Sequence, residues 1–179
     1  QFPMNLNIWV RLILTLASKH WRSNLKIDEE CSTPFMVVPT DLDLNLHMNN
    51  ARYFAWMDIA RLDFLQRTGL LRVFKSKKWF PVVADETISF GKSLDLFDKV
   101  SVITKVRGWD EKFIFLEQRF QRNNETVAGG IVRSCILNKN GPVPTETVLS
   151  ALMHEKKSPE LSTWIKDWAK ARKPLLLRD

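Results

Sequence analysis

The chain has 179 residues, 45% of them hydrophobic and 26% charged, which is the composition of one globular domain and not of a disordered segment. Its formal net charge of +7 is compatible with a nucleic-acid partner, but no helix-turn-helix, RNA-binding or zinc-finger pattern accompanies the basic residues, so we expect no nucleic acid to bind. The two cysteines, Cys31 and Cys135, lack metal-ligand spacing; they argue against a zinc site or a disulfide framework and predict buried, reduced thiols in a cytoplasmic protein.

Residues 1–33 are predicted to form an N-terminal amphipathic helix and a polar connection. Apolar side chains recur at helical spacing up to Ala17, and Arg11 interrupts them. The run is too short and too broken to span a bilayer, and no small-residue cleavage site marks a signal peptide. The helix either packs on the domain or lies on a membrane surface, so peripheral membrane contact is one of two open alternatives.

The main folded unit is expected over residues 34–140, beginning with a short strand at 35–38. Prolines on both sides restrict that strand to an edge or an end of the sheet. The strongest helix prediction covers residues 51–67, which lack Gly and Pro and repeat apolar side chains every three or four positions. Asn49 or Asn50 can cap its start.

Two further details of this helix can be predicted from local rules. Gly69 stands just beyond its last turn, where a residue in the left-handed conformation commonly ends a helix. Asp63 and Arg67 are four positions apart, the spacing of an ion pair on one helix face. We therefore expect the helix to end before Gly69 and Asp63 to pair with Arg67.

Four β-rich runs follow, at residues 82–90, 99–107, 112–121 and 126–137. Their alternating pattern and the turn residues between them predict an antiparallel meander. One long helix against one sheet is an α+β arrangement, and apolar groups on both sheet faces predict a subunit partner. Residues 141–179 are predicted to be a C-terminal helical extension in two pieces, divided near Pro159.

Polar side chains gather immediately before the long helix, in residues 41–53, DLDLNLHMNNARY. The first turn of a helix offers unpaired N–H groups and a positive dipole end that can hold an oxyanion. An aspartate just upstream can act as a general base or a nucleophile. Asp and Asn before a helix are also ordinary caps and turn formers, so spacing alone leaves catalysis and capping both open.

This run resembles the DxDxxxHxNNxxY signature of the 4-hydroxybenzoyl-CoA thioesterase-like branch of the hotdog superfamily, and is similar to the thioesterase superfamily member 6 type within it. The resemblance continues through residues 56–61, 81–98 and 108–111. It implies a hotdog fold, with a long central helix wrapped by a five-stranded antiparallel sheet. It also implies an acyl-CoA thioesterase that works as a homodimer or a dimer of dimers, with no cofactor and no metal.

The resemblance also assigns roles to individual residues. Asp43 matches the family's general base or nucleophile, and His47 and Asn49 match the HxNN element that shapes the catalytic loop and the helix start. Tyr53 matches an aromatic residue that borders the acyl or pantetheine channel, and Asn50 is assigned with it to substrate binding. The expected reaction releases a carboxylic acid and free coenzyme A.

Two departures from the family pattern keep an alternative open. Leu46 stands where many relatives have Gly, and Asn50 stands where one subgroup has a catalytic His. They favour a non-hydrolytic protein that binds acyl-CoA or an acyl carrier.

A basic run follows the long helix. Its members are Arg72, Lys75, Lys77 and Lys78. They are candidates for binding the phosphates of coenzyme A, and a solvated loop is the competing interpretation.

Overall fold

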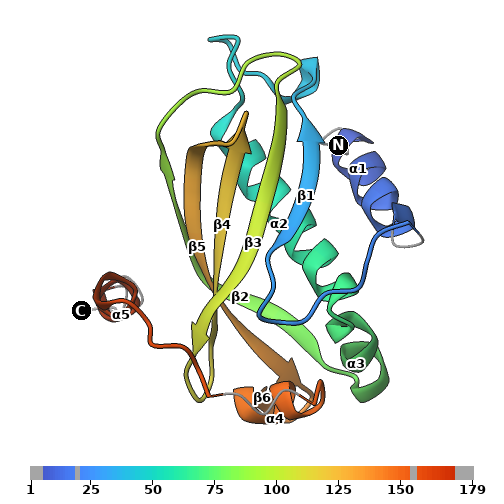
Figure 1. Cartoon of the computed structure of the whole chain (residues 1–179), viewed down its shortest axis with the longest axis vertical. Helices are drawn as coiled ribbons and strands as arrows, with labels where there is room; N and C mark the ends of the chain where they lie inside the picture. Colours follow the sequence, from blue (N-terminus) through green and yellow to red (C-terminus); the bar gives the residue numbers. More distant parts are fainter. Residues whose placement is uncertain (1–5, 19–20, 154–156, 172–179) are drawn as a thin grey trace.

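The computed structural model describes residues 6–18, 21–153 and 157–171. The first residues of the predicted N-terminal helix and the last residues of the predicted C-terminal extension lie outside these ranges. The elements follow the order α1 (Leu6–Ala17), β1 (Cys31–Met36), the 3-10 turn η2 (Pro39–Asp41), α2 (Asn50–Arg67), α3 (Leu70–Lys77), β2 (Phe80–Phe90), β3 (Lys99–Trp109), β4 (Ile114–Arg122), β5 (Glu125–Asn138), β6 (Gly141–Val143), α4 (Thr145–Ser150) and α5 (Thr163–Ala171), as Figure 1 shows.

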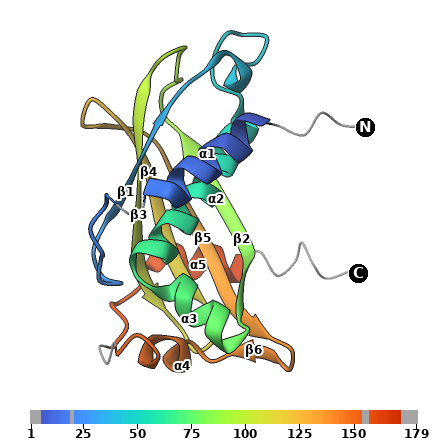
Figure 2. The same cartoon turned by 90° about the vertical axis from the view of Figure 1, so that its right-hand side faces the viewer.

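The strands form one curved antiparallel sheet, and α2 lies along its inner face (Figures 1 and 2). The strand order is β1-β3-β4-β5-β2, with β6 added beside β5. The α+β hotdog prediction is therefore confirmed, with a short sixth strand that the sequence did not indicate. The predicted meander is wrong at its start, because β2 pairs with β5 and not with β3. Residues 91–98 are too long for a tight hairpin and let the chain cross to the far side of the sheet.

Helix α2 is the centre of the core, and its ends follow the predicted capping rules. The Asn49 side chain accepts the N–H of Ala51 at 2.9 Å, and Gly69 adopts φ +81° just after the last turn. Trp56 is fully buried and stacks on Phe35 with ring centroids 4.7 Å apart. These contacts fix the direction in which the first turn of α2 points.

A glycine lets this helix approach the sheet closely. A Cβ at Gly130 would lie 2.7 Å from the carbonyl oxygen of Thr87 and 3.0 Å from the terminal methyl of Met57. Any larger residue on this part of β5 would push α2 or β2 away.

Helix α1 packs on the domain through a mixed side, in which Arg11 and Ile8 both contact the domain. Arg11 donates to Asp41 at 2.7 Å, and Gln66 of α2 donates to the carbonyl of Leu16 at 2.9 Å. The outward residues are apolar and 46 to 63% exposed: Trp9, Val10, Ile13 and Leu14. Of the two alternatives, packing on the domain is confirmed, yet a helix of this kind normally turns its apolar side to the core. None of the described helices is long and apolar enough to cross a membrane.

The predicted pairing of Asp63 with Arg67 is wrong. Asp63 is buried against β1, where it accepts from Arg22 and from the Thr33 hydroxyl at 2.6 Å. Arg67 reaches away from it and donates to the backbone of Ser23 at 3.0 Å. The partners of Asp63 come from segments more than 29 residues away, which helix spacing does not reveal.

The interpretation of the basic run as a solvated loop is right about exposure but wrong about the backbone. Arg72, Lys75 and Lys77 lie on α3, and Lys78 caps its end. Leu70 and Phe74, one turn apart, are both 2% exposed and attach the helix to the core.

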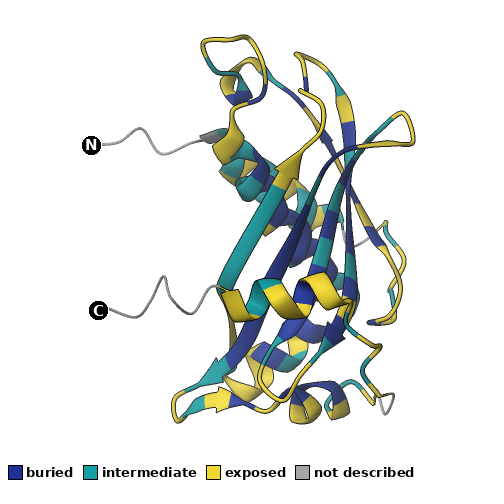
Figure 3. Ribbon diagram, turned by 90° about the vertical axis from the view of Figure 1, so that its left-hand side faces the viewer, coloured by how far each residue is buried: buried dark blue, intermediate teal, exposed yellow. Residues whose placement is uncertain are grey.

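The two predicted C-terminal helical pieces are α4 and α5. Helix α5 crosses the outer face of the sheet (Figure 3), where Ile165 packs with Phe115 and Ile131. The prediction for the cysteines is confirmed as well, because Cys31 and Cys135 are both buried and free. Burial, aided by Asp63, raises the pKa of Cys31 to about 11.

Candidate functional site

The two aspartates of the D-x-D pair have different surroundings. Asp41 is fully buried and accepts from Arg11 at 2.7 Å, from Asn7 at 2.9 Å and from the backbone N–H of Val38 at 3.0 Å. Both oxygens of this carboxylate are therefore engaged by structural partners. Asp41 anchors the loop to α1.

Asp43 is only partly buried, at the base of a small loop. Its Oδ1 accepts the backbone N–H of Asn45 at 2.8 Å, which holds the carboxylate in an Asx turn. Within residues 6–18, 21–153 and 157–171, no cation forms an ion pair with Asp43. Of the pair, it is the carboxylate that retains capacity to accept a proton.

The loop between these aspartates and α2 is closed by backbone hydrogen bonds. The N–H of Asp43 donates to the carbonyl of His47 at 2.9 Å, and Met48 donates to the carbonyl of Leu94 at 2.8 Å. Leu46 has φ +61°, the left-handed conformation that glycine adopts most easily. The backbone shape that a glycine would give is thus present, and the leucine side chain is 73% exposed.

The first turn of α2 presents one N–H that its own cap does not use. The N–H of Ala51 goes to the Asn49 side chain, and that of Arg52 goes to the Asn49 carbonyl, both at 2.9 Å. In the described part of the chain, no acceptor is recorded for the N–H of Asn50. This group lies at the positive end of an 18-residue helix.

A cavity of about 340 Å³ joins these features; we call it the Asp43 cavity. It brings together four of the predicted residues: Asp43, His47, Asn50 and Tyr53. Asn49 is outside the lining and caps the start of α2 next to these residues. The opposite wall was not predicted and comes from the end of β2 and the following turn: Phe90, Gly91, Lys92 and Ser93.

Tyr53 and His47 differ in solvent exposure within this cavity. Tyr53 is 2% exposed and packs on Phe90 and Phe120 with ring centroids 5.0 Å away, and burial raises the pKa of its hydroxyl. His47 is exposed, with Nε2 3.6 Å from Oδ1 of Asp95 in the facing loop. Tyr53 therefore forms a buried part of the wall, whereas His47 lies at the exposed rim.

The basic run on α3 does not join this cavity within one chain. It follows α2, while the Asp43 cavity precedes it, and 18 helical residues extend about 27 Å. Four of the nine predicted site residues are therefore at the far end of the domain. They reach Asp43 only if a second copy brings them there.

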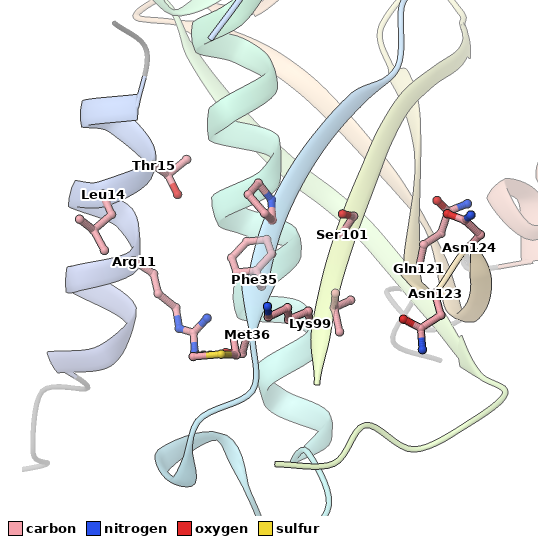
Figure 4. Close-up of a pocket in the computed structure, with 12 residues that line it drawn as sticks. Arg11, Leu14, Thr15, Phe35, Met36, Lys99, Ser101, Gln121, Asn123 and Asn124 are labelled. Carbon is pink, nitrogen blue, oxygen red and sulfur yellow. Dashed lines mark hydrogen bonds between the residues drawn. The ribbon is translucent and has the colours of Figure 1, made fainter. Parts of the chain in front are cut away.

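A wider hollow of about 540 Å³ lies between α1 and the turn after β4 (Figure 4). Its lining includes Arg11, Lys99 and the amides of Gln121, Asn123 and Asn124, and it contains no carboxylate and no imidazole. It therefore lacks a general base. Among the described residues, no cluster of His, Cys, Asp or Glu is arranged to hold a metal ion.

Comparison with known proteins identifies the family of the chain. A sequence profile of the thioesterase-like superfamily matches residues 37–169. Protein THEM6 of Xenopus laevis is 32% identical over 142 residues, 79% of this chain and 68% of that protein. Protein THEM6 of Drosophila melanogaster is 26% identical over 90% of this chain and 86% of its own length. A probable thioesterase of Saccharomyces cerevisiae is 30% identical over 58% of this chain and 45% of that protein.

Solved structures share the fold. The gentisyl-coenzyme A thioesterase BH1999 superposes with a TM-score of 0.61 at 24% identity, covering 66% of this chain and 98% of that one. YbaW, a probable thioesterase from Escherichia coli, gives a TM-score of 0.65 at 21% identity, over 69% and 97% of the two chains. A Staphylococcus aureus protein solved in complex with CoA gives 0.61 at 17% identity, over 78% and 92%.

Proposed function

Because the chain belongs to the thioesterase-like superfamily, and so to the class of thioester hydrolases, we propose that it hydrolyses an acyl-CoA to a free acid and coenzyme A with Asp43 as its acid-base or nucleophilic group. The observation that carries this proposal is the contrast within the D-x-D pair. Asp41 is consumed by structural bonds, whereas Asp43 faces a cavity at the start of α2. The structural neighbours include a gentisyl-coenzyme A thioesterase and a protein solved in complex with CoA, which supports coenzyme A as the carrier.

The oxyanion is assigned to the N–H of Asn50. As the thioester carbonyl becomes tetrahedral, negative charge grows on its oxygen, and a preorganised donor at a helix N-terminus stabilises that charge. The N–H groups of Ala51 and Arg52 are already engaged, which makes Asn50 the donor that remains.

Asp43 has two routes to the same products. As a general base it takes a proton from water, the water oxygen bonds to the carbonyl carbon, and the C–S bond breaks to release the thiolate. As a nucleophile it bonds to that carbon itself and the C–S bond breaks to expel the thiolate; water then attacks the resulting mixed anhydride, which releases the acid and regenerates Asp43. In single turnover in ¹⁸O-water, label enters the Asp43 carboxylate only by the second route, when water attacks the aspartyl carbon.

We also propose a homodimer formed through the edge of β2. In the described sheet this strand has a neighbour only on its β5 side, and it exposes Phe80, Val82, Val83 and Phe90. An unpaired apolar edge of 11 residues is a template for another strand. A two-fold axis across it pairs β2 with its copy in antiparallel fashion.

This pairing gives the α3 cations a role. Antiparallel strands place the Phe80 end of one β2 beside the Phe90 end of the other, and Phe90 lines the Asp43 cavity. Arg72, Lys75, Lys77 and Lys78 precede Phe80 and so approach the partner's cavity. We assign them to the phosphates of coenzyme A.

The outward side of α1 is assigned to a lipid surface. Its exposed residues are apolar, and Trp9 together with the 83% exposed Trp21 are the side chains that favour the membrane interface. The formal charge of +7 favours anionic lipid. Two free cysteines fit a reducing compartment such as the cytosol.

Asp43→Asn tests the function directly, because it keeps the shape and removes the basic oxygen. We expect hydrolysis of acyl-CoAs, followed as thiol release, to fall at least about 100-fold with an unchanged melting temperature. The matched control is Asp167→Asn on the exposed side of α5, which should retain full turnover. Full activity in Asp43→Asn would remove Asp43 from the mechanism.

The competing function is acyl-CoA or acyl-carrier binding without hydrolysis. It is favoured by Asn50, whose amide cannot shuttle a proton as a histidine would. Thermal stabilisation by acyl-CoAs with no thiol release from the unaltered protein would select this function.

A further inference from the structure

A second cavity, of about 270 Å³, lies between the sheet and the C-terminal half of α2, with α3 at its floor. We call it the apolar cavity. Twelve of its 15 lining residues are apolar, and the deepest ones are 2 to 4% exposed: Ile27, Phe64, Leu70, Phe74 and Ile136. Protein interiors seldom leave voids of this size, and an apolar void binds apolar ligands more readily than water.

Three members of the lining are polar: Asp58 and Arg61 on α2, and Ser134 on β5. Arg61 donates to Gln118 at 2.8 Å, lies 3.4 Å from Glu86 and also pairs with Asp58. Asp58 and Glu86 are each paired with the Arg61 guanidinium, and the twelve apolar residues of the lining carry no group that attracts a charged or strongly polar ligand. The cavity suits a hydrocarbon chain.

The mouth of the apolar cavity opens at the edge of β2. Its exposed members are Asp58 on α2 and Pro81 and Val83 on β2. In the dimer proposed above, that end of β2 lies beside the partner's Phe90, which lines the partner's Asp43 cavity. The Asp43 cavity itself is polar and has no deep apolar branch among its lining residues.

We infer that each apolar cavity holds the acyl tail of a thioester whose carbonyl lies at the partner's Asp43, and that the preferred acyl group is a linear aliphatic chain of medium length. This inference rests on the proposed function for the carbonyl site. If a methylene takes about the ~30 Å³ of a water molecule, the cavity accepts roughly nine of them, the tail of a decanoyl group.

Binding to the non-hydrolysing Asp43→Asn protein tests the cavity without any need for catalysis. Calorimetric affinity for acyl-CoAs should rise about two- to fourfold per methylene from butanoyl to decanoyl and then level off. Val83→Trp and Leu62→Phe, which narrow the mouth from its two walls, should weaken decanoyl-CoA at least about tenfold and leave acetyl-CoA unchanged. Val10→Trp is the control, because this valine is similarly exposed but lies on α1, away from the lining and from the β2 edge.

Complementation tests the sharing of the site between chains. Asp43→Asn and Val83→Trp should each be inactive on decanoyl-CoA, but dimers of one chain of each kind contain one intact site. Co-expression should therefore restore about a quarter of the normal activity through random pairing. If mixed dimers form and no activity returns, the sharing of the site between chains is refuted. If affinity does not depend on acyl chain length, the assignment of the acyl tail to the apolar cavity is refuted. Binding that follows chain length without any turnover would refute only the proposed hydrolysis.

Discussion

At the scale of single residues, Asp41 is the group whose loss should cost the most stability. Asp41→Asn leaves the Arg11 guanidinium, only 12% exposed, without its counter-charge. Breaking such a buried pair typically costs about 3 kcal/mol in the free energy of unfolding. Urea unfolding measures this, with Asp167→Asn as the exposed control; equal midpoints for the two variants would show that Asp41 is not the anchor.

Local rules predicted the residues whose partners are near in sequence. The Asn49 cap, the turn at Gly69 and the grouping of Asp43, His47, Asn50 and Tyr53 depend on a few neighbouring positions. The partner of Asp63, by contrast, is Arg22, 41 positions away. Likewise the wall from Phe90 to Ser93 is brought to the site by the sheet, and no local pattern indicates it.

At the scale of elements, the free edge of β2 should decide the assembly. Thr87→Lys adds a long charged side chain near the middle of that edge in each chain, the kind of residue by which natural sheets prevent edge-to-edge pairing. We expect the dimer dissociation constant to rise at least about tenfold, measured by sedimentation velocity, and activity to fall with it.

Ser32→Lys serves as the control for this change, since it places the same charge on β1, the opposite edge of the sheet. Dimers that persist in Thr87→Lys but dissociate in Ser32→Lys would place the interface on β1.

Strand positions were predicted to within a few residues, because alternation is visible in the sequence. Strand order was not, since the meander rule assumes short connections and residues 91–98 are a long one. Helix α3 was missed because it is only eight residues long and its three cations, Arg72, Lys75 and Lys77, directed attention to charge and away from the apolar spacing.

At the scale of the whole molecule, the exposed side of α1 should govern attachment to lipid. The double change Ile13→Ser and Leu14→Ser removes two side chains that are more than 60% exposed, so folding stability should stay the same. Cosedimentation with phosphatidylcholine vesicles, with and without phosphatidylserine, should fall at least about tenfold.

Trp164→Ser on α5 removes an apolar side chain of similar exposure, 56%, from another face and should bind vesicles normally. Equal loss in both variants would mean that attachment is not specific to α1.

A single residue connects α1 with the start of α2. Asp41 holds Arg11 of α1 through its side chain and Asn49, the cap of α2, through its carbonyl at 2.9 Å. A lipid surface that binds α1 therefore binds the helix that Asp41 ties to the loop of Asp43. If the surface changes the affinity for substrate by some factor, the substrate must change the affinity for the surface by the same factor. Vesicle titrations with and without decanoyl-CoA on Asp43→Asn would give that factor, and a value of one would mean that the surface and the substrate bind independently.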